Sequence, residues 1–188
     1  DHDHGHDDDD DHDEYDEHVW LSFDNAKKMV NLISAKLQEM DGEHAAQFKE
    51  REESYLKELD SLEKDYQEAI ANGKRKEIIV GDRFPFLYLV RSLGLTYDAA
   101  YPGCSANVEE NAQTIKSLID KVKAQNIPVV FHIEMSSERI ADRIVEATGA
   151  KKSMLHSIQN VSKEEMDAGE NYVSLMKKNL DALKEALN

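Results

Sequence analysis

The first eighteen residues carry side chains that bind divalent metals. Residues 1–18 hold 11 acidic residues and five of the chain's eight histidines, with no lysine or arginine. Because like charges repel, we expect this tract to be disordered unless a cation neutralises it. Imidazoles among carboxylates favour zinc-like ions over Ca²⁺ or Mg²⁺; the alternative is a solvated acidic linker. The composition therefore predicts an auxiliary low-affinity metal site formed by four histidines: His2, His4, His6 and His12.

A second set of metal-binding side chains follows runs that are typical of buried strands. Asp82 follows the first run, His132 and Glu134 follow the third, and His156 follows the fourth. In open parallel sheets the functional crevice lies beyond the carboxyl ends of the strands. These residues at one sheet edge would form a zinc or manganese site, with His18 as a further ligand from outside the lobe.

Each of these residues also has a structural interpretation. Asp82 lies beside Arg83 and could pair with a cation or cap the following helix. A histidine such as His132 is more often a hydrogen-bonded residue at a strand end than a ligand, and Glu134 could support the next helix or orient a ligand. His156 is the best ligand candidate. Spacing does not decide between these interpretations, because ligands from separate strands have no fixed interval.

The single cysteine, Cys104, excludes an internal disulfide and a cysteine-based zinc cluster. It precedes a predicted helix, whose N-terminus could lower the thiol pKa. The sequence pairs it with no histidine, and a small buried thiol is the more common role. The sequence also lacks a Gly-rich phosphate loop and a G-x-S-x-G elbow. We therefore predict that the protein is not an enzyme.

Composition excludes several classes of partner. Among 188 residues, 39 are acidic and 23 basic, which gives a formal charge of −16. Such an acidic excess repels nucleic acid and anionic membrane surfaces. No apolar run approaches the roughly 20 residues that span a bilayer. The hydrophobic fraction of 40% is sufficient for a packed core.

The periodicity of the apolar residues predicts the elements that position these side chains. A helix over 22–40, with Ser22 as N-cap, precedes a longer one over about 43–71, which would be about 40 Å long and could brace two bodies. Strand-like runs then alternate with helical patterns, which predicts right-handed βαβ units and an α/β fold with a roughly four-stranded parallel sheet flanked by helices. The predicted strands are 77–81, 95–101, 127–132 and 151–155, and the predicted helices are 107–125, 137–148 and one from about Ser162 to the end.

Asp16-Glu17-His18-Val19-Trp20-Leu21-Ser22 resembles the D-P-H-V-W-L-S-P motif of the metal-binding receptors of zinc and manganese ABC importers. The His/Asp-rich tract beside this motif and the long helix fit the same family. The ending Tyr172-Val173-Ser174-Leu175-Met176-Lys177-Lys178-Asn179-Leu180 is similar to the family's Y-x-x-L-M-x-x-N-L. The resemblance runs nearly from end to end of the chain.

This resemblance implies a chelatase-like fold of the helical-backbone metal-receptor type, in which a long helix joins two α/β lobes and the metal lies between them. His18 matches the motif's ligand histidine. His156 falls where the family typically has an aspartate ligand, and Asp82 lies within one residue of a third ligand. Glu17 and Phe23 replace the two prolines of the motif.

The resemblance also implies the organisation and function of the chain. We expect the C-terminal part of an extracytoplasmic receptor, periplasmic or lipid-anchored, that delivers Zn²⁺, or alternatively Mn²⁺, to an ABC permease. The first lobe and its anchor would precede Asp1. The expected segments are a metal-binding loop (1–18), a remnant helix of the first lobe (19–42), a linking helix (43–72) and the C-terminal α/β lobe (73–188).

Two other functions are compatible with the sequence. One is a surface adhesin or scaffold that binds metal incidentally. The other is a metallohydrolase that uses Asp82, Glu134 and His156 around a metal-bound water.

Overall fold

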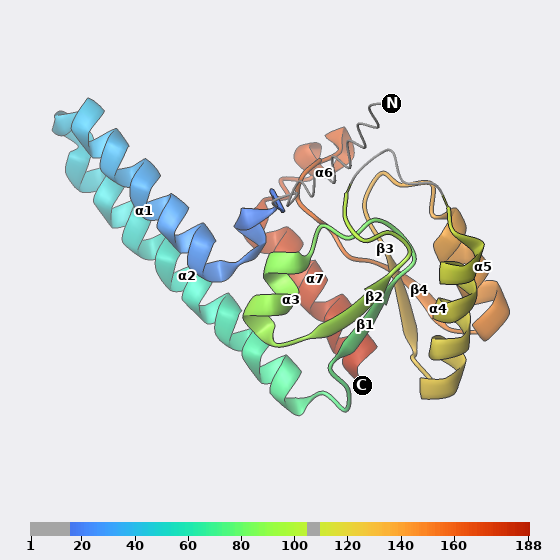
Figure 1. Cartoon of the computed structure of the whole chain (residues 1–188). Helices are drawn as coiled ribbons and strands as arrows, with labels where there is room; N and C mark the ends of the chain where they lie inside the picture. The colour runs from blue at the N-terminus through green and yellow to red at the C-terminus, as the bar shows by residue number, and fades with distance from the viewer. Residues whose placement is uncertain (1–15, 105–109) are drawn as a thin grey trace, which may run out of the picture.

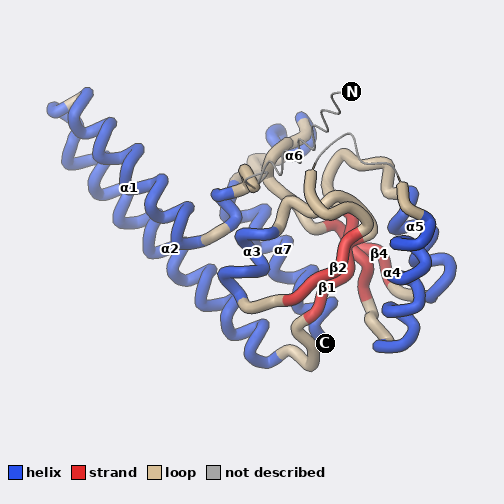
Figure 2. Tube along the Cα trace, in the orientation of Figure 1, coloured by secondary structure: helices blue, strands red, loops and turns tan. Residues whose placement is uncertain are grey.

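The computed structural model describes residues 16–104 and 110–188. Its centre is a parallel sheet with the strand order β2-β1-β3-β4. The chain adds β2 on one side of β1 and β3 on the other, so the strand order reverses between β1 and β3, where open α/β sheets bind their ligands. The predicted fold class is confirmed (Figure 2). The strands are β1 (Glu77–Val80), β2 (Thr96–Ala99), β3 (Val129–His132) and β4 (Lys151–Met154).

Helices cover both faces of this sheet. Ile78 and Val80 of β1 belong to one apolar cluster and Ile79 to the other, because successive strand side chains point to opposite faces. The first cluster includes residues of α2, α3 and α7, and the second includes residues of α4 and α5. The helix bounds are α2 (Ala45–Asn72), α3 (Leu87–Leu93), α4 (Ala112–Gln125), α5 (Arg139–Thr148) and α7 (Tyr172–Leu187).

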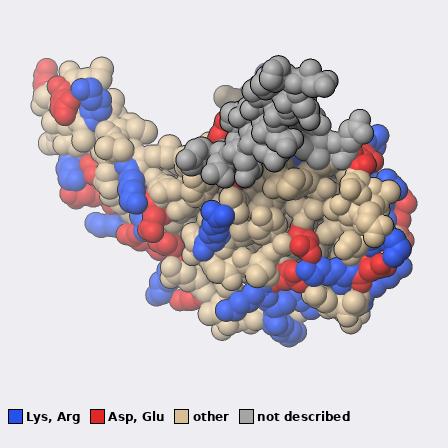
Figure 3. Space-filling model, viewed as in Figure 1, with Lys and Arg blue, Asp and Glu red and all other residues tan. Residues whose placement is uncertain are grey.

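A helical hairpin projects from the lobe (Figure 1). It is formed by α1 (Phe23–Met40), the short turn η2 (Gly42–His44) and α2. The predicted N-cap is confirmed, since the Ser22 hydroxyl accepts a hydrogen bond from the Asn25 N–H at 3.4 Å. Between the two helices, the hydroxyl of Ser34 donates to the buried carboxylate of Glu52 at 2.9 Å. Acidic and basic side chains are interspersed over the visible surface of the hairpin and the lobe (Figure 3).

The end of the chain differs from its prediction. The single helix predicted from about Ser162 is wrong, because two helices are present: α6 (Lys163–Asp167) and α7. Gly169 adopts a left-handed φ of 77°, which glycine tolerates and which ends a helix. Asn171 then begins α7, as its side chain accepts the Ser174 N–H at 3.1 Å.

The start of α4 also differs from its prediction. This helix begins at Ala112 after the N-cap Asn111, whereas the predicted start at Asn107 falls outside the described residues.

No helix in the described part of the chain has the length and apolar character needed to cross a membrane.

Candidate metal centre

The segment that carries His18 is attached to the α/β lobe. The indole N–H of Trp20, in the short 3₁₀ turn η1 (Val19–Leu21), donates to the Ser157 carbonyl at 2.9 Å. The hydroxyl of Tyr172 donates to the Trp20 carbonyl at 2.7 Å. Phe23 is buried, and its ring packs edge-on against Tyr66 with centroids 5.1 Å apart. These contacts hold His18 beside the loop that follows β4.

His18 is buried, and both of its ring nitrogens have polar neighbours. Its Nδ1 atom lies 3.0 Å from Asp16 Oδ1, and the same carboxylate oxygen accepts the His18 backbone N–H at 2.8 Å. A neutral imidazole that donates from Nδ1 to a carboxylate has its lone pair on Nε2, which is the arrangement of a metal-binding histidine. His18 Nε2 lies 3.1 Å from Gln159 Oε1, and exchanging the amide oxygen and nitrogen would let the Gln159 amide donate to Nε2 instead.

The two strand-end carboxylates connect loops of the lobe. Asp82, which follows β1, accepts the Arg83 N–H at 2.8 Å and the Ile133 N–H at 3.3 Å. The second bond crosses the point between β1 and β3 at which the strand order reverses. Glu134, which follows β3, accepts the Ser157 N–H at 2.8 Å and also the Ser157 hydroxyl. Both carboxylates are buried and bonded within the protein, although each oxygen keeps a further lone pair.

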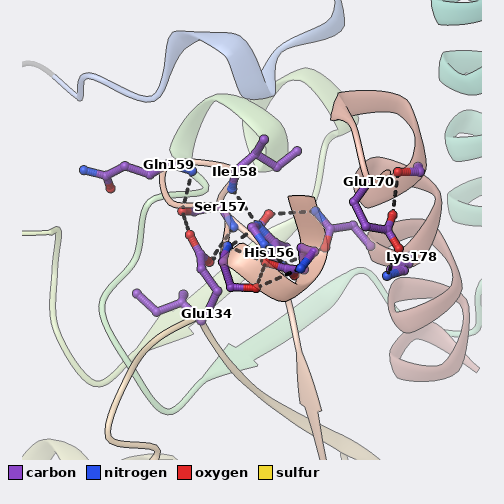
Figure 4. Close-up of polar contacts among 12 residues, drawn as sticks. Glu134, His156, Ser157, Ile158, Gln159, Glu170 and Lys178 are labelled. Atoms are coloured by element: carbon purple, nitrogen blue, oxygen red, sulfur yellow. Dashed lines mark hydrogen bonds and ion pairs between the residues drawn. The ribbon is translucent and has the colours of Figure 1, made fainter. Parts of the chain in front are cut away.

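His156 is only 1% exposed and is held firmly through its backbone. Its N–H donates to the Asn179 side-chain oxygen at 2.7 Å, and its carbonyl accepts the Asn179 amide at 2.8 Å. In the imidazole, Nδ1 accepts the Ile158 N–H at 2.9 Å (Figure 4). The Nε2 atom lies 3.2 Å from Glu165 Oε1. The two hydrogen bonds with the His156 backbone explain why Asn179 of α7 is buried although its side chain is polar.

His132 lies at the end of β3 but faces different partners. Its Nδ1 atom is 3.0 Å from the Ile133 carbonyl and 3.8 Å from Glu138 Oε1. A neutral His132 that donates to its neighbour's carbonyl matches the structural interpretation made from the sequence.

Cys104 lines the same cavity as the two strand-end carboxylates, yet its thiol is not activated. Burial, together with a smaller effect of the nearby Asp16 carboxylate, raises its pKa from 9.0 to about 11. A thiol with a raised pKa is a poor nucleophile and metal ligand near neutral pH. The structure thus favours the small partly buried thiol over the catalytic cysteine.

A cavity of about 450 Å³ opens beyond the carboxyl ends of the strands. It brings together residues from the loops after β1, β2, β3 and β4, which are far apart in the sequence. Within 16–104 and 110–188, no three His, Cys, Asp or Glu side chains are grouped closely enough to hold a metal ion. The four auxiliary histidines of the tract, His2, His4, His6 and His12, lie outside the described residues. Lining residues relevant to the predicted site are Asp82, Arg83, Cys104, Glu134, Ser157 and Gln159.

Three residues at this site were not predicted from the sequence to take part. Asp16 orients His18, Gln159 faces its Nε2 atom, and Glu165 faces His156. Glu165 has a local signal, because Ser162 and a glutamate three residues later form a capping box. Nothing local identifies Gln159, which lies 141 positions from its partner.

Comparisons with known proteins agree on one family. The sequence profile described as "ZnuA: Zinc-uptake complex component A periplasmic" matches residues 1–186. The chain is 33% identical over 172 residues to the "High-affinity zinc uptake system protein ZnuA" of Bacillus subtilis (strain 168). It is 34% identical over 185 residues to the "Zinc-binding lipoprotein AdcA" of Streptococcus pneumoniae.

Solved structures give the same result. A crystal structure of the metal-dependent lipoprotein YcdH from Bacillus subtilis superposes with a TM-score of 0.79 at 33% identity, over 92% of this chain and 65% of that one. The Zn(II)-bound ZnuA-like domain of Streptococcus pneumoniae AdcA superposes with a TM-score of 0.76 at 32% identity, over 93% and 64%. The two sequence matches include 92% and 98% of this chain. They include only 53% of the Bacillus protein and 36% of the streptococcal one, so the chain spans about half or less of the length of these relatives.

Proposed function

Since this chain belongs to the ZnuA family of periplasmic zinc-uptake components, we propose that it is the metal-binding C-terminal part of a zinc receptor. The receptor captures Zn²⁺ outside the cytoplasm and delivers it to the membrane permease of an ABC importer. The observation that carries this proposal is the buried His18 imidazole, which Asp16 orients so that Nε2 is available to a metal. Capture and release form no bond within a substrate, so the proposal requires no catalytic residue.

The proposed cargo site lies between the His18 segment and the loops that end β1 and β4. His18 is its first ligand, and His156 and Asp82 are the two ligands from the lobe. Glu134 bonds to Ser157 and His132 faces a backbone carbonyl, so we assign these two to orienting roles. Two imidazoles favour Zn²⁺, while Mn²⁺ prefers oxygen donors and is the alternative cargo.

We also propose the segment roles expected from the sequence: a metal-binding loop over 1–18, a first-lobe helix within 19–42, a linking helix over 43–72 and the metal-binding lobe over 73–188. The surface of α1 supports the second assignment. Five apolar side chains on this helix are between 39% and 74% exposed, and we call them the α1 stripe. Its residues are Met29, Leu32, Ile33, Leu37 and Met40. A stripe of this length is expected to pack against another part of a longer receptor.

Zinc calorimetry on paired variants tests the proposed function. The background carries alanine at the four auxiliary histidines, so that the tract does not mask the main site. We expect His18→Ala to weaken zinc binding by about tenfold or more, because a direct ligand is lost. His44→Ala is the matched control, since His44 is an exposed imidazole in the hairpin turn, paired only with Asp41 among described residues. Equal affinities in the two variants would contradict the proposal.

A further inference from the structure

The cavity beyond the strand ends is larger than a single ion needs. Its volume is about 450 Å³. One water molecule takes up about 30 Å³ in the liquid, so a zinc ion with four water molecules would fill well under half of this space. Pockets of about 300–1,000 Å³ typically hold small organic ligands. The cavity therefore has room for a small molecule beside the metal.

The cavity carries cationic side chains as well as carboxylates. Asp82 and Glu134 line it, which suits a metal ion, but Arg83 lines it too. Among residues 16–104 and 110–188 the Arg83 guanidinium has no carboxylate within ion-pair distance, whereas Arg139, which also lines the cavity, pairs with Glu110. A guanidinium beside Asp82 repels a bare dication. An anion that enters with the metal would neutralise this charge.

The backbone around Arg83 is fixed in position. Its N–H donates to Asp82 Oδ1 at 2.8 Å, and the N–H of the next residue, Phe84, donates to the Gly103 carbonyl at 3.1 Å. The Phe84 ring is buried, whereas the Arg83 side chain is exposed. The Arg83 charge also opposes the effect of burial on the pKa of Cys104, which lines the same cavity. The guanidinium thus lies at the mouth of the cavity, beside the carboxylate proposed to bind zinc.

Neutral hydrogen-bonding groups surround the same space. The loop after β3 contributes Ser136 and Ser137, and the loop after β4 contributes Gln159 and Asn160. The Ser136 hydroxyl oxygen accepts the Glu138 N–H at 3.3 Å, which leaves its own hydrogen free to donate. Hydroxyl and amide groups donate to carboxylate oxygens, and an arginine binds a carboxylate through two parallel hydrogen bonds. These groups suit a small carboxylate better than a bare ion.

We propose that the cavity takes zinc as its complex with a small polycarboxylate, in which one carboxylate binds Arg83 while the others stay on the metal. Zinc can bind three protein ligands and a fourth from solution. The carboxylates also cancel the charge of the cargo, so that Arg83 attracts the complex although it repels bare Zn²⁺. Arg83 is a specificity-determining residue in this arrangement, and the inference rests on the proposed function.

Equilibrium dialysis with ¹⁴C-labelled citrate tests the inference on the chain that carries alanine at the four auxiliary histidines. We expect the chain to retain about one citrate with zinc present and much less without zinc. Equal retention without zinc, or no retention although calorimetry shows that zinc binds, would overturn the inference. Failure to bind zinc with or without citrate would instead overturn the proposed function.

Arg83→Gln tests the contribution of the guanidinium. In the presence of zinc we expect about tenfold weaker citrate binding, because charge-assisted hydrogen bonds are lost. The affinity for zinc without citrate should be unchanged or slightly higher. Arg91→Gln is the matched control, since Arg91 is an exposed arginine in the last turn of α3, and it should change neither quantity. Normal citrate binding in Arg83→Gln, or an equal loss of affinity for zinc alone, would overturn the role of Arg83.

Labelled inorganic phosphate in place of citrate identifies the class of anion. Citrate should be retained more strongly, because it can leave one carboxylate for Arg83 while its other carboxylates hold the metal. Stronger zinc-dependent retention of phosphate than of citrate would overturn the assignment to a carboxylate.

Discussion

At the scale of single residues, a local hydrogen bond to each ring decides what each imidazole can do. Asp16 lies against His18 Nδ1 and Gln159 against its Nε2, whereas His156 Nδ1 accepts the Ile158 N–H. The two histidines therefore differ in readiness for metal although both are buried. This difference follows from hydrogen bonds and not from residue type.

The role of Asp16 leads to a prediction about affinity. Asp16→Asn keeps the size of the side chain but removes the charge that orients His18. Loss of such an orienting partner typically weakens metal binding by about 10- to 100-fold. Zinc calorimetry should show a loss in this range. Asp24→Asn, at an exposed carboxylate in the first turn of α1, is the control and should bind zinc normally.

Cys104 provides a prediction about pH. Because its pKa is raised from 9.0 to about 11, the reactive thiolate is scarce at pH 8 and increases as the pH rises toward that value. Alkylation by iodoacetamide at pH 8 should be about a hundredfold slower in the folded chain than in the chain unfolded by urea. Mass spectrometry of timed samples measures both rates. Equal rates would show that the thiol is not shielded.

At the scale of elements, close backbone packing and caps position the site. Gly81 follows β1 and leads directly to Asp82, and its N–H donates to the Phe131 carbonyl at 2.8 Å. A Cβ atom at this position would lie 2.7 Å from the Ala141 Cα atom of α5. Only glycine lets α5 approach the sheet this closely.

Gly81→Ala should therefore destabilise the lobe. The added methyl meets backbone that cannot move aside, and overpacking of this kind costs about 1–3 kcal/mol. Urea denaturation followed by circular dichroism should show a lower midpoint. The matched control is Gly42→Ala, where a Cβ atom would meet nothing within 4 Å, and its midpoint should be unchanged or slightly higher. A normal midpoint in Gly81→Ala would mean that α5 shifts freely.

At the scale of the whole molecule, the chain consists of a sheet-centred lobe and a projecting helical hairpin (Figure 1). The lobe buries two apolar clusters, whereas the α1 stripe lies exposed on the hairpin. The contacts of Trp20 and Tyr172 join the hairpin's base to the lobe. The hairpin is thus anchored at one end and has an apolar surface along its length.

The exposed stripe should tolerate charge. Leu32 is 72% exposed and Ile33 is 58% exposed, so replacing both by lysine should change the unfolding free energy of this chain by at most about 0.5 kcal/mol per site. Urea denaturation of the double variant and of the parent chain measures this difference. Leu59→Lys, at a fully buried position of α2, is the comparison and should unfold the chain. A large loss of stability in the double variant would show that the stripe is already packed.

Much of the architecture could be predicted because its signals are local. The spacing of the apolar residues predicted the strands and most helices, and Ser22 predicted the start of α1. The break between α6 and α7 was missed although Gly169 and Asn171 are visible in the sequence, because the apolar pattern continues on both sides. The apolar pattern alone allows either one long helix or two shorter ones at the end of the chain, and packing in the folded protein selects the two helices.

The sequence by itself determined the α/β class, the membership in a zinc-receptor family and the supply of imidazoles and carboxylates, since these depend on short windows and composition. Only the tertiary structure decided how those side chains are used. Gln159 meets His18 across 141 positions, and Glu134 meets Ser157 across 23. No spacing rule relates such pairs, because folding brings strand ends together from unrelated points of the chain.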